Sequence, residues 1–219
     1  MITLEDVKKN PEVQQLIKGS QEQLNALGFT EHSFRHISIV SKRAGDVLEL
    51  LGYDKERVEL AKIAGYLHDI GNCVNRSDHA HSGAILAYNI LKDMGMNVKD
   101  RTDIMMAIGN HDEKTGTAVN DISAALILAD KSDVHRERVV NTNLSTFDKH
   151  DKVNYAVTNA DFKISKENRK VILDLTIDIE ISPVLNYFEI FMKRMLLCQK
   201  ASEYLKIKFS LVINNTKMI

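Results

Sequence analysis

The chain has 219 residues, of which 44% are hydrophobic and 27% charged, and its formal net charge is −1. This composition is typical of a globular protein with an ordinary core, and the lack of a basic excess argues against general nucleic-acid binding. The two cysteines, Cys73 and Cys198, form no CxxC motif, which argues against a disulfide scaffold and favours a cytoplasmic protein. The first residues lack the apolar segment of a signal peptide, and each later apolar run is too short or too charged to span a membrane.

Helical periodicity dominates the first two thirds of the sequence, and glycines fall between the periodic segments, as expected for helix stops. The predicted helices are Leu4–Leu27, Glu31–Leu51, Lys55–His68, Ser77–Met94, Val98–Asn110 and Asp121–Arg138. We therefore predict a mainly α fold in which residues 1–140 form a helical domain. The polar segment 141–154 is predicted to be a linker.

The apolar period changes to two residues in the last part of the chain. Apolar residues alternate from Val171 to Ile181, which predicts a half-buried strand, and a weaker strand precedes it. Ser182 and Pro183 are expected as the N-cap and the first residue of a helix that reaches about Tyr204, and residues 208–214 as a last strand. Residues 155–219 are thus predicted to form a small α+β subdomain in the order β-β-α-β. The edge strands of this subdomain could pair with those of a second copy, which would form a homodimer.

Ionisable residues recur at the ends of these predicted helices. His68 and Asp69 end an apolar run in "AGYLHDIGNC", and Asp130 interrupts another in "ALILADKS". A His-Asp pair alone is most simply a pair of helix caps, but a buried Asp130 is costly unless a group pairs with it. Imidazoles and carboxylates that converge from several helices favour a metal site with mixed nitrogen and oxygen ligands. The residues of this set are His32, His36, His68, Asp69, His79, His81, His111, Asp112 and Asp130.

Six of these residues, in the order His36, His68, Asp69, His79, His111 and Asp130, resemble the pattern of the HD-domain superfamily of metal-dependent phosphohydrolases, over roughly residues 31–139. The two histidines between the His-Asp pair and the last Asp are similar to its two-metal branch. The resemblance implies a helical HD bundle in which Asp69 bridges two divalent metals and is central to catalysis. It assigns His36, His68 and Asp130 to the first metal, and His79 and His111 to the second.

The motifs "HDIG" and "HDE" also resemble the HD-GYP phosphodiesterases, with three departures. Asn72 replaces a lysine that often follows "HDIG", Asp112 replaces a second histidine, and the Gly-Tyr-Pro motif is absent. These departures argue against a cyclic-di-GMP phosphodiesterase and leave the metal ligands intact.

Further residues are candidates for roles around the metals. His32, one turn before His36, and Asp112, beside His111, are candidates for a contact to a ligand, a further metal or the substrate. Candidates for binding a substrate phosphate are Arg76, Lys114, Lys131 and Arg136 or Arg138. The alternative for each of these cations is that it is a solvent-exposed charge that binds no phosphate. Ligands rich in histidine favour Mn, Fe, Co, Ni or Zn over Mg.

We therefore expect a cytoplasmic enzyme that hydrolyses a phosphomonoester or phosphodiester of a nucleotide or small metabolite with metal-activated water. Its expected partner is a small phosphorylated substrate, with no membrane and no bulk nucleic acid. Residues 155–219 are expected to complete the fold without supplying metal ligands. Two alternatives stay open: an HD-fold di-iron oxygenase, and a non-catalytic metal-bound sensor or interaction protein.

Overall fold

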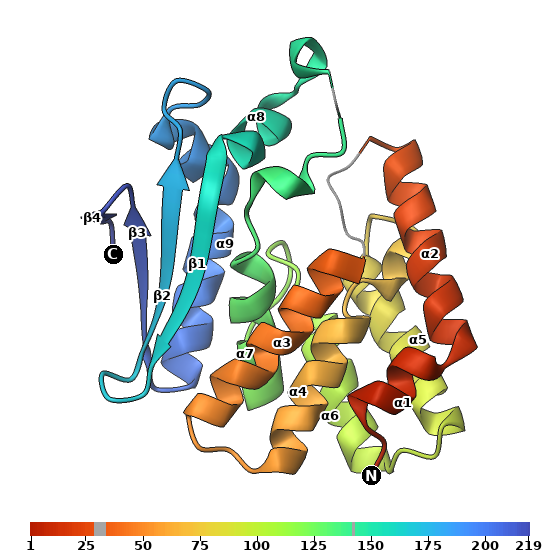
Figure 1. Cartoon of the computed structure of the whole chain (residues 1–219). Coiled ribbons are helices and arrows are strands. Elements are labelled where there is room, and N and C mark those ends of the chain that lie inside the picture. The colour runs from red at the N-terminus through yellow and green to blue at the C-terminus, as the bar shows by residue number, and fades with distance from the viewer. Residues whose placement is uncertain (29–33, 142) are drawn as a thin grey trace.

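Helices α1 to α7 form the first part of the chain, and a small sheet with two further helices forms the last part (Figure 1). The computed structural model describes residues 1–28, 34–141 and 143–219. The helices of the first part are α1 (Leu4–Lys9), α2 (Pro11–Ala26), α3 (Phe34–Leu50), α4 (Lys55–Leu67), α5 (His79–Asp93), α6 (Val98–Gly109) and α7 (Asp121–Lys131). The short 3₁₀ helices are η1 (Ile70–Cys73), η2 (Arg136–Arg138) and η3 (Leu144–Thr146).

The last part consists of α8 (Lys149–Ala156), β1 (Val157–Ser165), β2 (Lys170–Ile177), α9 (Val184–Tyr204), β3 (Lys208–Ile213) and β4 (Thr216–Lys217). Strands pair in the order β1-β2-β3-β4, with β2 and β3 parallel and the other two pairs antiparallel. Helix α9 makes the crossover between the parallel strands and packs against α7, so it joins the sheet to the helical part (Figure 1). No helix in the described ranges has the length and apolarity needed to cross a bilayer.

The predicted mainly α fold with a small C-terminal α+β element is confirmed, and several predicted boundaries are wrong. The first predicted helix breaks at Asn10, whose side chain accepts hydrogen bonds from the backbone of Glu12 and Val13 and so begins a second helix at Pro11. Segment 141–154, expected as a linker, contains η3 and most of α8. Pro183, not Ser182, is the N-cap of α9, and β4 adds a fourth strand to the expected three.

The predicted helix Asp121–Arg138 ends early, at Lys131, and this ending shapes the site. The hydroxyl of Ser132 donates to the carbonyl of Ala129 at 2.6 Å, and the chain then turns back into η2. Arg138 is buried on this returning segment and donates to the carbonyl of Asp133 at 2.8 Å. Asp133 and Arg138 therefore lie beside the end of α7.

Helix α7 is the centre of the core, and close backbone contacts bring the other helix ends toward it. Every residue of α7 from Ile122 to Lys131 is buried. Two glycines allow η1 to approach α5: a Cβ added at Gly71 would lie 2.5 Å from the backbone nitrogen of Gly83. Since η1 directly follows Asp69, this approach places the His-Asp pair beside the first turn of α5.

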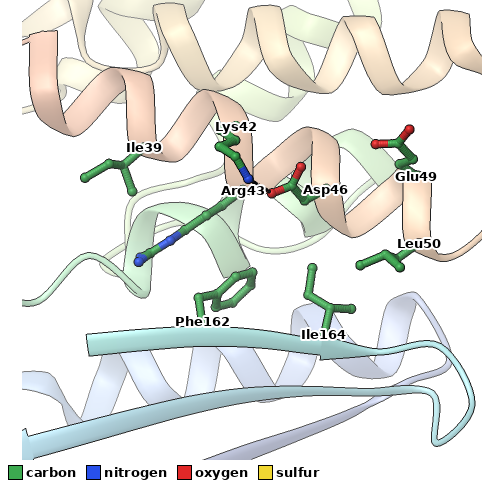
Figure 2. Close-up of a pocket in the computed structure, with 8 residues that line it drawn as sticks. All are labelled: Ile39, Lys42, Arg43, Asp46, Glu49, Leu50, Phe162 and Ile164. Carbon is green, nitrogen blue, oxygen red and sulfur yellow. Dashed lines mark hydrogen bonds and ion pairs between the residues drawn. The ribbon is translucent and has the colours of Figure 1, made fainter. Parts of the chain in front are cut away.

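A groove separates α3 from β1 and is lined by Ile39, Lys42, Arg43, Asp46, Glu49, Leu50, Phe162 and Ile164 (Figure 2). Arg43 crosses it: its guanidinium donates to Ser132 Oγ at 2.9 Å and to the carbonyl of Ala160 at 3.3 Å. Arg43 thus ties β1 to α3 and to the end of α7. None of the residues of this groove belongs to the histidine cluster described below.

Candidate metal centre

Two imidazoles and two carboxylates from three parts of the helical bundle meet at one buried point. His36 Nε2 lies 3.6 Å from Asp69 Oδ2 and 3.5 Å from Asp130 Oδ1. His68 Nε2 lies 3.2 Å and 3.7 Å from the same two oxygens. Ligands held about 2.0–2.2 Å from one metal ion are separated by roughly 3.0–3.5 Å. The donor atoms of His36, His68 and Asp130 all lie within 4.8 Å of one another, and Asp69 Oδ2 lies close to both imidazoles, so these groups are near enough to hold one ion.

A second group of possible ligand atoms lies near the other carboxylate oxygen of Asp69. His79 Nε2 is 3.5 Å and His111 Nε2 is 4.0 Å from Asp69 Oδ1, and the two Nε2 atoms are 3.2 Å apart. Both rings are buried. The carboxylate of Asp69 thus lies between two clusters of nitrogen donors, with one oxygen toward each.

Hydrogen bonds on the far side of each ring fix the orientation of all four histidines. Nδ1 of His36 donates to Asp133 Oδ2 at 2.7 Å, and Nδ1 of each of the others donates to a backbone carbonyl. These pairs are His68 with Gly65 (2.8 Å), His79 with Arg76 (3.1 Å) and His111 with Ile108 (2.6 Å). Because Nδ1 carries the proton, Nε2 presents a lone pair to the cluster, which is the arrangement of metal-bound histidine. The donor set therefore fits transition-metal ions.

The electrostatics of the cluster also suit cations. Burial, together with the nearby His68 and Lys131, lowers the pKa of His111 to about 3 and keeps this ring neutral. Burial raises the pKa of Asp130, but Lys131 and His36 outweigh it and hold this carboxyl ionised well below its usual range. Burial lowers the pKa of His68, but Asp69 outweighs it and raises the pKa, so the carboxylates that attract a proton there would also attract a metal.

Two residues that the sequence analysis did not assign hold the proposed ligands in place. Asp133 accepts the proton of His36 Nδ1, as described above. Asn72, noted only as a departure from a motif, donates from Nδ2 to Asp69 Oδ1 at 2.9 Å and to the carbonyl of Asp69 at 3.0 Å. Asp133 follows Asp130 by three residues, and this spacing is the feature of the sequence that could have identified Asp133 as part of the site.

A pocket opens onto the cluster and is lined by Asp69, Arg76, His79, His111, Glu113, Asp130, Lys131, Arg138 and Arg194. Three of the cations expected from the sequence, Arg76, Lys131 and Arg138, are among these residues. Lys114 is exposed and Arg136 stacks on Tyr155, and neither lines the pocket. Glu113 and Arg194 are additions that the sequence did not indicate.

The remaining predicted residues occupy different places. Asp112 is half-buried, with Oδ2 3.9 Å from Nδ1 of His79, so it lies at the edge of the cluster. His32 lies outside the described residues. His81 is exposed and pairs with Asp78 rather than with the cluster. The part of the chain beyond residue 154 supplies no donor atom to either described group of ligands, but it supplies Arg194 to the pocket.

Comparison with known proteins places the chain in a family. Residues 29–152, more than half of the chain, match the HD domain, and the protein belongs to the HD domain family. Proteins of this family bind divalent metals and are, in general, metal-dependent phosphohydrolases. The match ends before β1, so the sheet and α9 lie outside it.

Two similar proteins were found. An uncharacterized protein of Methanocaldococcus jannaschii is 29% identical over 157 residues, which are 61% of this chain and 60% of that protein. The chain therefore spans about three fifths of the length of this relative. The crystal structure of a predicted HD superfamily hydrolase from an uncultured Thermotogales bacterium matches with a TM-score of 0.45 and 25% identity, and the match covers 62% of this chain and 75% of that one.

Proposed function

We propose that this protein is a phosphohydrolase with two metals, which cleaves a phosphomonoester or phosphodiester of a nucleotide or another small metabolite. The observation that carries the proposal is the position of Asp69. Its two oxygens face separate histidine groups, and the same carboxylate lines a pocket that also contains four cationic side chains.

The donor distances support the ligand assignment that the family resemblance implies. His36, His68 and Asp130 would hold one divalent ion and His79 with His111 the other, with Asp69 shared between them. When bound, such ions (Mn, Fe, Co, Ni or Zn) supply Lewis-acid activation of water and offset the charge of the phosphoryl group. The hydrogen bonds of Asp133 and Asn72 keep the His36 ring and the Asp69 carboxylate in place for this task.

The residues of the pocket suit the phosphoryl group of a substrate. Lys131 is buried, and its ammonium lies 2.7 Å from Asp130 Oδ2 and 2.8 Å from Glu113 Oε2. Burial lowers the pKa of Lys131, but Asp130 and Glu113 outweigh it and raise the pKa, so this residue stays cationic. Arg76 and Arg138 line the same pocket, and guanidinium groups bind phosphate oxygens in pairs.

Elemental analysis combined with a hydrolysis screen tests the proposal. Purified protein would be assayed for bound metals and for hydrolysis of p-nitrophenyl phosphate, bis(p-nitrophenyl) phosphate and a set of nucleotides. We expect about two transition-metal ions per chain and turnover of at least one phosphoester. Iron that changes redox state with oxygen uptake, and without hydrolysis, would instead identify an oxygenase. Bound metal with neither activity would identify a sensor.

A further inference from the structure

Arg194 reaches the pocket from α9, which lies outside the residues that match the HD domain. It is the one residue beyond position 152 among those that line this pocket in the described part of the chain. Helix α9 is held there by its packing against α7, the helix that carries Asp130. The C-terminal element therefore contributes a cation to a cluster otherwise built by the HD domain.

Two contacts fix the guanidinium of Arg194. Its Nε donates to Glu113 Oε1 at 3.1 Å, and its central carbon lies 4.7 Å from the centre of the Phe191 ring. Within the described ranges, its two terminal nitrogens make no hydrogen bond to protein. The planar group is thus anchored at one edge and one face, while the donors at its far end remain available to a ligand.

The other cations of the pocket are engaged differently. Lys131 lies between two carboxylates, those of Asp130 and Glu113. Arg138 donates to the carbonyl of Asp133, and Arg76 donates to Asn72 at 3.1 Å. Arg194 therefore offers the pair of parallel donors that suits the oxygens of a phosphate.

The net charge of the residues that line the pocket also favours the binding of an anion. Three carboxylates, Asp69, Glu113 and Asp130, face four cations among its described lining residues. If Asp69 and Asp130 bind divalent ions, Glu113 remains as the carboxylate that offsets both Lys131 and Arg194. A phosphate dianion would offset part of this excess of positive charge.

We propose that Arg194 binds the phosphoryl group of the substrate through its two terminal nitrogens, so that α9 completes the active site. Glu113 is then a positioning residue, because it holds both Arg194 and Lys131. This inference rests on the proposed phosphohydrolase function and extends it to a residue outside the HD domain.

The test compares Arg194→Met and Arg194→Lys with Lys193→Met in the metal-loaded full chain. Lys193 is the exposed neighbour on α9, so its variant removes one positive charge without altering the pocket. Calorimetric binding of inorganic phosphate gives Kd, and p-nitrophenyl phosphate gives KM and kcat. A charged hydrogen-bonded pair contributes about 1.5–3 kcal/mol, which corresponds to roughly 10- to 100-fold in affinity.

We expect Arg194→Met to raise both Kd for phosphate and KM by about 10- to 100-fold, with unchanged metal content. Arg194→Lys should recover only part of this loss, because an ammonium cannot reproduce the planar fork. Lys193→Met should match the unaltered protein. If Arg194→Met fails to fold, the Lys variant decides, and an unchanged Kd in it contradicts the inference.

A purely structural role for Arg194 predicts a different pattern. In that case Tm would fall in Arg194→Met while Kd and KM stay constant, and this result would overturn the inference. Failure of the protein to bind inorganic phosphate would overturn it as well. If phosphate binds with the expected dependence on Arg194 but no phosphoester is hydrolysed, the proposed function fails and the anion site stands.

Discussion

Asp133 holds the ring of His36: its Oδ2 accepts a hydrogen bond of 2.7 Å from Nδ1 of His36. The opposite nitrogen of the ring then faces Asp69 and Asp130. Burial raises the pKa of Asp133, but its bond to His36 and the charge of Arg138 hold it well below its usual range. An ionised partner of this kind fixes the tautomer of a metal-binding histidine and makes its free nitrogen a stronger ligand.

Replacing Asp133 with Asn should therefore weaken metal binding without removing a ligand. We expect the metal affinity of Asp133→Asn to fall about 10- to 100-fold, the usual cost of losing such a partner. Competition with a chelator of known affinity measures this change. Asp161→Asn, at an exposed position on β1, is the matched control. Equal affinities in the two variants would show that Asp133 does not act through His36.

Replacing Asp69 with Ala should remove metal and activity together. Asp69 is the residue whose two oxygens face both histidine groups, and water cannot replace its charge. We expect metal content to fall to less than half and turnover to fall at least about 100-fold, since bound metal contributes several kcal/mol to such reactions. Far-UV circular dichroism should be unchanged, because Asp69 follows the end of α4. Asp93→Ala, exposed at the end of α5, is the control, and full metal content in Asp69→Ala would refute the assigned role.

The pH dependence of stability should report the ion pair between Arg57 and Asp121. Arg57 of α4 donates from Nε to both oxygens of Asp121 (2.9 and 2.8 Å) and from Nη1 to Asp103, so it joins three helices of the HD domain. Burial raises the pKa of Asp121, but the hydrogen bond and charge of Arg57 outweigh it and lower the pKa. Because the unfolded chain binds this proton first, near pH 3.9, the pair stabilises the fold above that pH and loses its effect as the pH falls through the lower, folded pKa.

Asp121→Asn should accordingly lower the free energy of unfolding at pH 7 by about 1.5–3 kcal/mol. The variant should also lose less stability than the parent protein between pH 5 and pH 3. Urea unfolding at several pH values measures both effects. A parallel pH dependence in the two proteins would mean that Arg57 does not stabilise the charged form of Asp121.

The two thiols should differ in reactivity. Cys198 of α9 is buried, and burial raises the pKa of its thiol to about 12, whereas Cys73 is half-buried. At pH 8 a disulfide reagent should therefore modify Cys73 in the folded protein and reach Cys198 only after unfolding. The variant Cys73→Ser should show no reaction before denaturant is added. Rapid modification of one thiol in that variant would contradict the burial of Cys198.

Local patterns explain which features could be read from the sequence. Helix periodicity predicted the helical bundle. The order of the ionisable residues at helix ends, through its resemblance to the HD domain, predicted a group of six residues that the structure brings together. Arg194 was not predictable, because a tertiary contact between α9 and α7 brings it to residues more than sixty positions earlier in the chain. The end of α7 was also missed, because the turn at Ser132 depends on a side-chain hydrogen bond that apolar periodicity does not encode.

Anomalous diffraction from crystals of the Mn²⁺-loaded protein would show whether Asp69 contacts two metal ions. We predict two ions, one contacted by His36, His68 and Asp130, the other by His79 and His111, with Asp69 contacting both. A single ion, with His79 and His111 turned away from it, would contradict the account.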